Sequence, residues 1–377
     1  MKILIIFVIQ FFVLNLWAQN FEKIEVPFNG SADVIKIVDI NGDGKKDLIV
    51  DDNRSKSIVI LQQISANEFS EIQRIPFKDE DLFYFEFELG HYNEDDFLDI
   101  VVHNLHQNHY ILYGSKSGVF SEPQLYKFLL PVEHLTQQFK VKSSKKNAQM
   151  AVASEIELGI LDIEIHLPNS SMPIQKSLNL SEILIENDLF EIRQDVEDFV
   201  LGDYDGDGIL DLVFVCATDD YLMVLKGDKD FNFVADKIVK VYGGASKLLV
   251  IDVNSDGKDE VFVGHYKSQQ SLVLSYVKDE LNIQQSLVTG SFPTSFYYDS
   301  KSKNFVSLSY YGGLFTQFNN WKSTYFTGTP VINLALGRTG RYFSGSDINE
   351  DGHTDFAAII EINGEGKKIF VLYSQTP

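Results

Sequence analysis

An all-β fold built from seven repeated units is what the sequence predicts, and three observations lead to it. A short acidic pattern recurs five times, at intervals of about 50 residues or about twice that distance. Short runs rich in Val, Ile, Phe and Tyr lie between polar or Gly-rich turns, and such runs are typical of β-strands. Each unit has room for four strands, which at this period indicates the blade of a β-propeller.

The recurring pattern is D-x-[DN]-x-D-G-x-x-[DE], and an apolar run follows it directly. Its copies are DINGDGKKDLIV from Asp39, HYNEDDFLDIVV from His91, GDYDGDGILDLVF from Gly202, DVNSDGKDEVFV from Asp252 and DINEDGHTDFAA from Asp347. Each of the two longer gaps has room for one degenerate unit, at VKSSKKNAQMAVA from Val141 and at YYDSKSKNFVSLSYY from Tyr297. Five intact and two degenerate copies predict a seven-bladed propeller.

The first unit illustrates the strands expected in each blade. SADVIKIVDI leads into the acidic loop, and KDLIVDD, SIVILQQI and FSEIQRIPF follow it. The last unit ends after TDFAAIIEI and KKIFVLYSQ and is one strand short. NFEKIEVPF near the N-terminus resembles FSEIQRIPF, so we expect it to join the last blade and close the ring, which would hide a sheet edge. The segment SEILIENDLFEI, over 181–192, is ambiguous between helix and strand.

Residues 1–18 are predicted to be a signal peptide, and residues 19–377 a single propeller domain. One Lys precedes an apolar run of about sixteen residues, and the small residue Ala18 lies near its end. A transmembrane anchor is the alternative, but the run is short for a span of about 20 residues. No Cys lies near the predicted cleavage point. We therefore expect a secreted or cell-envelope protein with no lipid anchor and no transmembrane span in the mature chain.

The formal charge of −22, from 54 acidic and 32 basic residues, would repel a nucleic acid or an anionic membrane. Cys216 is the single cysteine, so no intrachain disulfide can form. We expect it to be a small buried apolar residue. An exported chain without disulfides must be stabilised by its core, by metal ions, or by both.

Calcium would explain why four carboxylates lie together in the loop after Gly202. Ca²⁺ takes about six to eight oxygen ligands in flexible geometry, and alternate residues of a tight loop can point at one centre. Gly208 would permit the left-handed turn, and the carbonyl of Ile209 would supply a further oxygen. The side-chain ligands predicted here are Asp203, Asp205, Asp207 and Asp211. Acidic turns without metal are the alternative, since Asp, Asn and Gly favour turns.

The other loops predict a similar ligand set, which gives up to five calcium sites. The predicted ligands are Asp39, Asn41, Asp43 and Asp47; Asn93, Asp95 and Asp99; Asp252, Asn254, Asp256 and Glu260; and Asp347, Asn349, Asp351 and Asp355. The second loop is the weakest, because His91 offers nitrogen in place of oxygen and Asp96 replaces the Gly. An EF-hand is excluded, because the twelfth position of the Asp203 loop is Phe214 and no helices flank it.

These repeats resemble the FG-GAP or VCBS type, which occurs in integrin α-subunit propellers and in many exported bacterial proteins. The resemblance covers nearly the whole mature chain. It implies a seven-bladed propeller with calcium in the loops between the first and second strands of the blades. It implies no single activity, since members of the family bind ligands, bind carbohydrate, or scaffold larger assemblies.

We expect a ligand to bind the face formed by the second-to-third-strand and blade-to-blade connections, which carries no calcium loop. Aromatic residues there could stack on sugars, or they could pack between blades: Tyr242, Phe292, Trp321, Tyr325 and Phe326. In HNLHQNHY, His103, His106 and His109 could bind zinc. A β-turn would not place them on one side, so a polar hairpin tip is the interpretation that we favour.

No catalytic constellation is recognisable in the sequence, because G-x-S-x-G, H-E-x-x-H and P-loop motifs are missing. We therefore expect a binding or interaction module for a carbohydrate or protein ligand, and not an enzyme. The alternatives are a propeller enzyme acting on extracellular polysaccharide or phosphoester, and a structural component of a surface complex.

Overall fold

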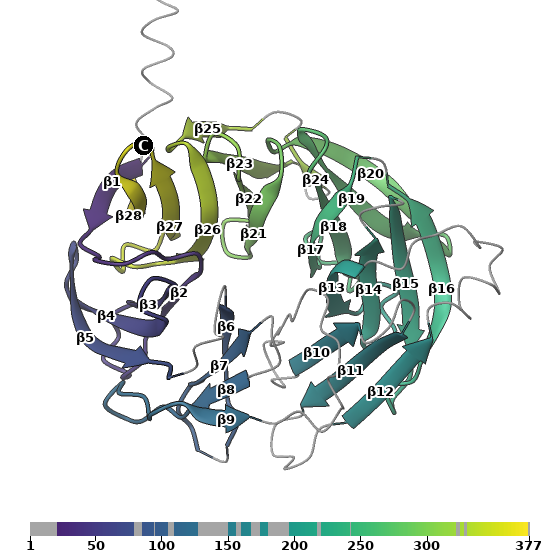
Figure 1. The fold of residues 1–377 in the computed structure, drawn as a ribbon. Helices are drawn as coiled ribbons and strands as arrows, with labels where there is room; N and C mark the ends of the chain where they lie inside the picture. Colours follow the sequence, from purple (N-terminus) through teal and green to yellow (C-terminus); the bar gives the residue numbers. More distant parts are fainter. Residues whose placement is uncertain are drawn as a thin grey trace, which may run out of the picture.

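The computed structural model describes residues 21–78, 85–93, 95–104, 109–126, 150–155, 160–166, 174–179, 196–216, 220–241, 243–321, 325–327 and 330–375. These residues form strands and turns, and the described part of the chain contains no helix. Its strands make seven antiparallel sheets that stand around a central axis (Figure 1). The predicted all-β propeller is therefore confirmed, and each sheet is called a blade below.

The first four blades follow one another along the chain. Blade 1 consists of β2 (Ile35–Val38), β3 (Asp47–Asp52), β4 (Ser57–Ser65) and β5 (Glu68–Pro76), and blade 2 of β6 (Phe85–Gly90), β7 (Asp99–Asn104), β8 (His109–Leu112) and β9 (Gln124–Tyr126). Blade 3 consists of β10 (Met150–Glu155), β11 (Ile160–His166) and β12 (Ile174–Asn179). Blade 4 consists of β13 (Val196–Gly202), β14 (Asp211–Cys216), β15 (Tyr221–Gly227) and β16 (Phe233–Lys240).

The last three blades follow in the same order along the chain, except that the final one also includes the N-terminal strand. Blade 5 consists of β17 (Ala245–Ile251), β18 (Glu260–His265), β19 (Gln270–Val277) and β20 (Glu280–Val288). Blade 6 consists of β21 (Pro293–Asp299), β22 (Asn304–Ser309), β23 (Leu314–Trp321), β24 (Tyr325–Phe326) and β25 (Ile332–Ala335). Blade 7 consists of β26 (Thr339–Ser346), β27 (Asp355–Ile362), β28 (Gly366–Ser374) and β1 (Phe21–Val26).

The two degenerate units occupy blades 3 and 6. In blade 3 the three described strands follow residues 127–149, which lie outside the described residues and include most of the segment from Val141. In blade 6, β21 and β22 form a hairpin whose turn, residues 300–303, contains no acidic residue. The ambiguous segment 181–192 also lies outside the described residues.

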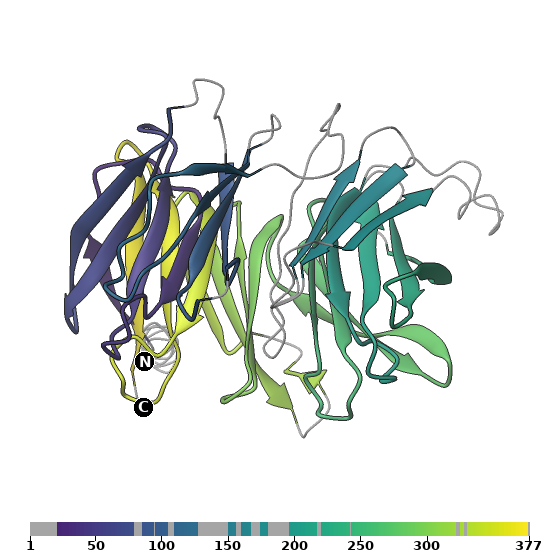
Figure 2. The same cartoon turned by 90° about the horizontal axis from the view of Figure 1, so that it is seen from below.

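The N-terminal strand belongs to the last blade. β1 pairs antiparallel with β28, from Phe21 opposite Ser374 to Val26 opposite Ile369, and the two strands lie side by side in both views (Figures 1 and 2). The predicted pairing between the two ends of the chain is therefore present. The predicted signal peptide lies outside the described residues, and the described residues include no helix long and apolar enough to cross a membrane.

The core lies between neighbouring blades, because sheets pack face to face and each apolar cluster joins the facing surfaces of two adjacent sheets. Ile49, Ile58 and Ile60 of blade 1 pack against Phe85 and Phe87 of blade 2 in one cluster. All six residues of β3, β14 and β18 are buried, which explains the apolar run inside each second strand: Leu48–Val50, Leu212–Cys216 and Val261–Val263. Cys216 is 1% exposed in such a cluster, which confirms that it is a buried small residue.

The antiparallel order gives the ring two different faces. Loops between first and second strands lie at one end of the blades, which we call the acidic face. Hairpins between second and third strands, and the connections between blades, lie at the opposite end, which we call the hairpin face. Every residue placed near the tip of a blade therefore belongs to one of two surfaces.

Candidate calcium loops and ligand face

The five acidic loops lie between the first and second strands of blades 1, 2, 4, 5 and 7, as the sequence predicts. They occupy residues 39–46, 91–98, 203–210, 252–259 and 347–354, between β2–β3, β6–β7, β13–β14, β17–β18 and β26–β27. All of them are therefore on the acidic face.

Hydrogen bonds within each loop fold it around its own side chains. In the fourth blade, Asp203 accepts the backbone N–H of Gly206 at 2.8 Å and of Gly208 at 2.9 Å. Asp205 accepts the N–H of Asp207 at 3.1 Å. Gly208 has φ of +82°, so the predicted left-handed turn is present. Corresponding bonds form at Asp39, Asn41, Asp43, Asn93, Asp95, Asp252, Asn254, Asp256, Asp347, Asn349 and Asp351.

The ninth residue of each loop has a structural role that the sequence analysis missed. The carboxylate of Asp211 is buried and accepts the N–H of Tyr204 in the loop at 3.3 Å and of Gly227 on β15 at 2.9 Å. It therefore ties the start of the loop to the third strand. The same two connections are made by Asp47, Asp99 and Asp355. Glu260, which is one carbon longer, makes the same bond to the loop, at the N–H of Val253, and its second oxygen accepts from the side chain of Asn254.

Burial of these acids opposes their ionisation. It raises the pKa of Asp211 to about 7, and the carboxylates of Asp205 and Asp207 add to the effect. Burial likewise raises the pKa of Glu260 to about 7 and those of Asp47 and Asp355 to about 6, and it raises the pKa of Asp99. A cation held in the loop would favour the ionised form of each group.

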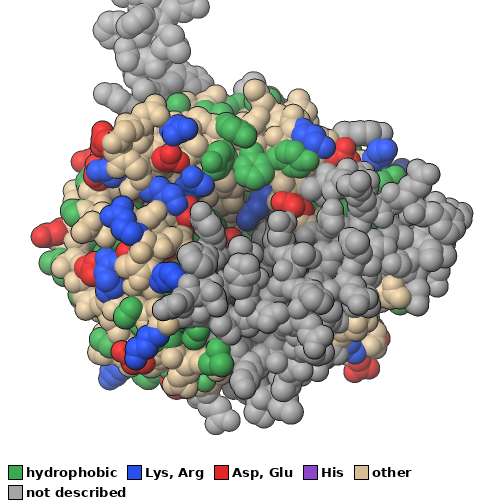
Figure 3. All heavy atoms as spheres, viewed as in Figure 1, with side chains coloured by type: hydrophobic (Ala, Val, Ile, Leu, Met, Phe, Trp, Pro, Cys, Tyr) green, Lys and Arg blue, Asp and Glu red, His purple; other side chains and the backbone are tan. Residues whose placement is uncertain are grey.

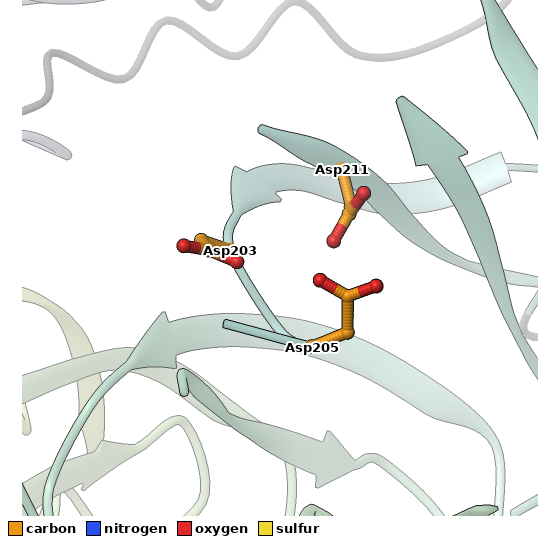
Figure 4. A group of neighbouring side chains, drawn as sticks. All are labelled: Asp203, Asp205 and Asp211. Atoms are coloured by element: carbon orange, nitrogen blue, oxygen red, sulfur yellow. The ribbon is translucent and has the colours of Figure 1, made fainter. Parts of the chain in front are cut away.

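The donor atoms of the loops suit calcium. In the fourth blade Asp203, Asp205 and Asp211 place carboxylate oxygens within 4.8 Å of one another (Figure 4). That separation matches two Ca–O bonds of about 2.3–2.6 Å. In the loop of blade 7, Oδ1 of Asp347 is buried and has no hydrogen-bond partner among the described residues. Oxygen donors and a buried oxygen without a partner both fit a hard divalent cation.

The loop of blade 2 differs from the others as the sequence suggested. Nδ1 of His91 lies 2.9 Å from the carbonyl oxygen of Phe97, which corresponds to the carbonyl of Ile209 that we expected to face an ion. Because His91 already uses this oxygen, the oxygen is not free to face an ion in this arrangement, and the weaker affinity of this loop stays a prediction.

Neighbouring loops also bind each other, and in each contact one partner is a residue that the repeat pattern does not specify. The N–H of Asp203 donates to the carboxylate of Asp259 from the loop of blade 5, and the N–H of Asp259 donates to the carbonyl of Asp203, both at 2.8 Å. Lys301, from the degenerate loop of blade 6, donates to the carbonyl of Gly352 at 2.6 Å. These bonds link adjacent blades on the acidic face.

Substitution of a ninth-position acid should separate its structural role from metal binding. Asp355→Ala would leave the N–H groups of Ile348 and Ser374 without the acceptor that now lies 2.9 and 2.8 Å away. Each buried amide left unpaired costs about 1–3 kcal/mol. We expect urea unfolding in EDTA to show a loss of about 2–6 kcal/mol.

Asp351→Ala in the same loop is the matched control, because Asp351 is exposed. We expect it to change the free energy of unfolding in EDTA by less than about 1 kcal/mol. Equal losses in the two variants would show that the ninth acid has no special structural role.

On the hairpin face, four aromatic side chains form a continuous row, called the aromatic row below. Ring centroids are 6.3 Å apart for Tyr266 and Phe292, 5.8 Å for Phe292 and Tyr310, and 5.1 Å for Tyr310 and Tyr311. Tyr311 is 63% exposed. In Figure 3 hydrophobic side chains gather over blade 6, with Lys and Arg side chains beside them.

Cations accompany this row. Lys267 lies over the ring of Tyr266 at 5.0 Å, and the Arg341 guanidinium over that of Tyr310 at 4.9 Å. Arg338 is 62% exposed at its side chain and lies next to Thr339, whose backbone bridges to Tyr311. The hairpin face therefore combines aromatic and positively charged groups around blades 5, 6 and 7.

The other predicted ligand residues divide into two groups. Phe326 is 3% exposed and packs against Phe262 and Phe305, so of the two roles predicted for it, packing between blades is confirmed. Tyr242 and His106 lie outside the described residues, as do the side chains of His103, His109, Trp321 and Tyr325.

Comparison with known proteins agrees with this architecture. Residues 203–263, which hold the loops of blades 4 and 5, match the model of the FG-GAP-like repeat. No curated protein matches the chain.

Solved structures share its fold at low sequence identity. BBS1N, crystallised in complex with ARL6DN, is 11% identical with a TM-score of 0.57, over 93% of this chain and 95% of that chain. Raptor of Chaetomium thermophilum is 10% identical with a TM-score of 0.63, over 96% of this chain and 30% of that chain. A functionally unknown protein of Desulfotomaculum acetoxidans is 11% identical with a TM-score of 0.52, over 74% of this chain and 77% of that chain. At such identities the likeness concerns the fold alone.

Proposed function

Because the chain is a β-propeller with repeats of the FG-GAP type, we propose that it is an exported, calcium-binding module that holds a protein partner on its hairpin face. The carrying observation is the separation of two chemistries: the oxygen-rich loops lie at one end of the blades, and the aromatic row with its cations lies at the other. Calcium would stabilise the scaffold, and the hairpin face would bind.

Calcium would be held by the side chains at the first, third, fifth and ninth positions of the loops. When bound, it supplies the positive charge that the ionised carboxylates require. The protein's own residues do the rest: Asp203 and its counterparts fold the loop, and Asp211 and its counterparts fix the loop to the third strand. In this proposal the calcium loops stabilise the fold and carry out no reaction, so we propose that the protein binds a partner and is not an enzyme.

Four observations favour a protein over a carbohydrate as the ligand. Neighbouring rings of the aromatic row are inclined at 79–85°, so they do not form the flat platform on which a sugar would stack. Tyr and Arg are the residues most often found at the centre of protein interfaces. The cation Lys267 suits an acidic partner surface, whereas Arg338 and Arg341 already form ion pairs with Glu361. BBS1N, which shares the fold, was crystallised with a protein partner.

The test compares three forms of the immobilised propeller in calcium-containing buffer: wild type, Tyr311→Ala/Arg338→Ala, and the control Val234→Ala. Val234 is 64% exposed on β16, away from the aromatic row. Proteins captured from culture medium and cell envelope are purified, and their affinity for each form is measured.

We expect a partner whose affinity falls at least about tenfold for the double variant and stays unchanged for the control. Equal affinity for all three forms would refute the hairpin face as the binding surface. A glycan array probed with the same three proteins tests the alternative that the ligand is a carbohydrate. A glycan that the wild type and the control bind, and that the double variant does not bind, would show that the ligand is a carbohydrate.

Export from the cytoplasm is tested by a separate measurement. We expect the intact mass of the chain expressed in a secreting bacterium to correspond to cleavage after Ala18, and the protein to be recovered outside the cytoplasm. An uncleaved chain that remains in the cytoplasm would refute export while leaving the binding proposal intact.

A further inference from the structure

The acidic loop of blade 4 differs from the other four at its third position. It has Asp205 there, and the corresponding residues are Asn41, Asn93, Asn254 and Asn349. This loop therefore carries one more negative charge than its sequence pattern requires.

Blade 4 is also distinctive on its third strand. Lys226 follows Leu225, which pairs with Leu212, the residue directly after Asp211. The same register in the other four blades with acidic loops gives uncharged residues at this position: Gln62, Tyr113, Ser275 and Tyr373. The extra acid and the extra base thus occur in the same blade.

The two residues are in direct contact. Nζ of Lys226 donates a hydrogen bond to Oδ2 of Asp205 and lies 3.1 Å from Oδ2 of Asp207. The side chain of Asp205 is only 9% exposed, and that of Lys226 is 40% exposed. The Asp205 carboxylate has therefore lost most of its water, and the ammonium group takes the place of that water as its counter-charge.

We propose that Lys226 is a tethered cation that neutralises Asp205, holds the loop of blade 4 in shape without calcium, and must be displaced when calcium enters. The loop of blade 4 then binds calcium more weakly than it would with a neutral residue at position 226. The inference that Lys226 competes with calcium rests on the proposed calcium binding. The inference that Lys226 neutralises Asp205 does not.

An ordinary surface salt bridge is the competing explanation, and such pairs contribute about 0–1 kcal/mol. Two observations argue against it: the side chain of Asp205 is only 9% exposed, and the pair coincides with an acid at the third position, where the other four loops have Asn. A calcium ion among these carboxylates would also repel an ammonium group bound to the same oxygens.

The first experiment measures stability in EDTA. The variants are Lys226→Gln, which introduces the residue of blade 1, Asp205→Asn, which introduces the residue of the other loops, and the double variant. Lys229→Gln, at an exposed turn of the same blade, is the control. We expect Lys226→Gln to lower the melting temperature by about 2–4 °C and the double variant to recover at least half of that loss. Additive losses, or an unchanged melting temperature for Lys226→Gln, would overturn the neutralisation.

The second experiment follows calcium at this loop alone. In protein labelled with ¹⁵N-glycine, the amides of Gly206 and Gly208 report on the loop of blade 4, and that of Gly44 on the loop of blade 1. We expect Lys226→Gln to lower the calcium midpoint at Gly206 and Gly208 about tenfold and to leave that of Gly44 unchanged. An unchanged midpoint at Gly206 and Gly208 would overturn the competition while calcium binding stands. Absence of any calcium-dependent shift would refute calcium binding itself, and the EDTA experiment would still decide the role of Lys226.

Discussion

Removal of calcium with EDTA at pH 7.5 is expected to lower the melting temperature by about 10–20 °C. At a free calcium concentration 100 times Kd, each occupied loop stabilises the folded state by about 2.7 kcal/mol. Four competent loops would add about 11 kcal/mol, and in a chain of this length 1 kcal/mol shifts the melting temperature by about 1–2 °C. Differential scanning calorimetry in calcium and in EDTA measures the shift.

The loss on chelation should also depend on pH. The folded-state pKa values of Asp47 and Asp355 are raised to about 6, and those of Asp211 and Glu260 to about 7. A carboxyl group whose pKa is higher in the folded protein than in the unfolded chain stabilises the fold. This contribution is fully present below about pH 4 and is lost as the pH rises through the folded-state pKa. The calcium-free protein should therefore be more stable at pH 5 than at pH 8, and the effect of calcium should be larger at pH 8.

A variant with Asn at Asp39, Asp252 and Asp347 is the control for chelation, because it weakens three of the four competent loops. We expect most of the calcium-dependent increase in melting temperature to disappear in this variant. An unchanged wild-type melting temperature in EDTA would instead mean that the loops are acidic turns stabilised by their own hydrogen bonds.

Local sequence was sufficient to predict the blades and the position of the loops. The repeat fixes where each second strand begins, and the apolar runs after Asp47 and Asp211 become the fully buried strands β3 and β14. The similarity of NFEKIEVPF to a fourth strand was enough to predict the pairing of β1 with β28, because both sequences alternate in the same way.

What the sequence did not reveal depends on strand register and on neighbouring blades. Lys226 meets Asp205 only because β14 and β15 pair in one register, which no spacing rule supplies. Asp259 reaches the preceding blade, and Phe326 is buried by Phe262 and Phe305, for the same kind of reason. An alignment of the third strands of the blades with acidic loops would have shown Lys226 as the one charged residue at its position. The sequence therefore did contain a signal for this contact.

Removal of the N-terminal strand should have the second large effect. A chain that begins at Pro27 would expose the edge of β28, whose backbone pairs with all six residues of β1. It would also uncover Phe315 and Phe356, against which Phe21 packs at 5.5 and 5.9 Å between ring centroids. Exposed apolar sheet edges promote aggregation, so we expect this truncated chain to be insoluble. A chain truncated after Ser374, which retains β1 and β28, should stay soluble.

Two further measurements attribute this effect to strand pairing. Val26→Asp places a carboxylate at a position that is 3% exposed, and we expect it to cost about 3–5 kcal/mol, whereas Glu25→Gln at an exposed ion pair should cost less than about 1 kcal/mol. A synthetic peptide spanning residues 19–28, added during refolding of the truncated chain, should restore solubility by occupying the edge of β28. If the truncated chain folds unaided and melts within about 2 °C of the full domain, the two ends of the chain contribute little to holding the blades together.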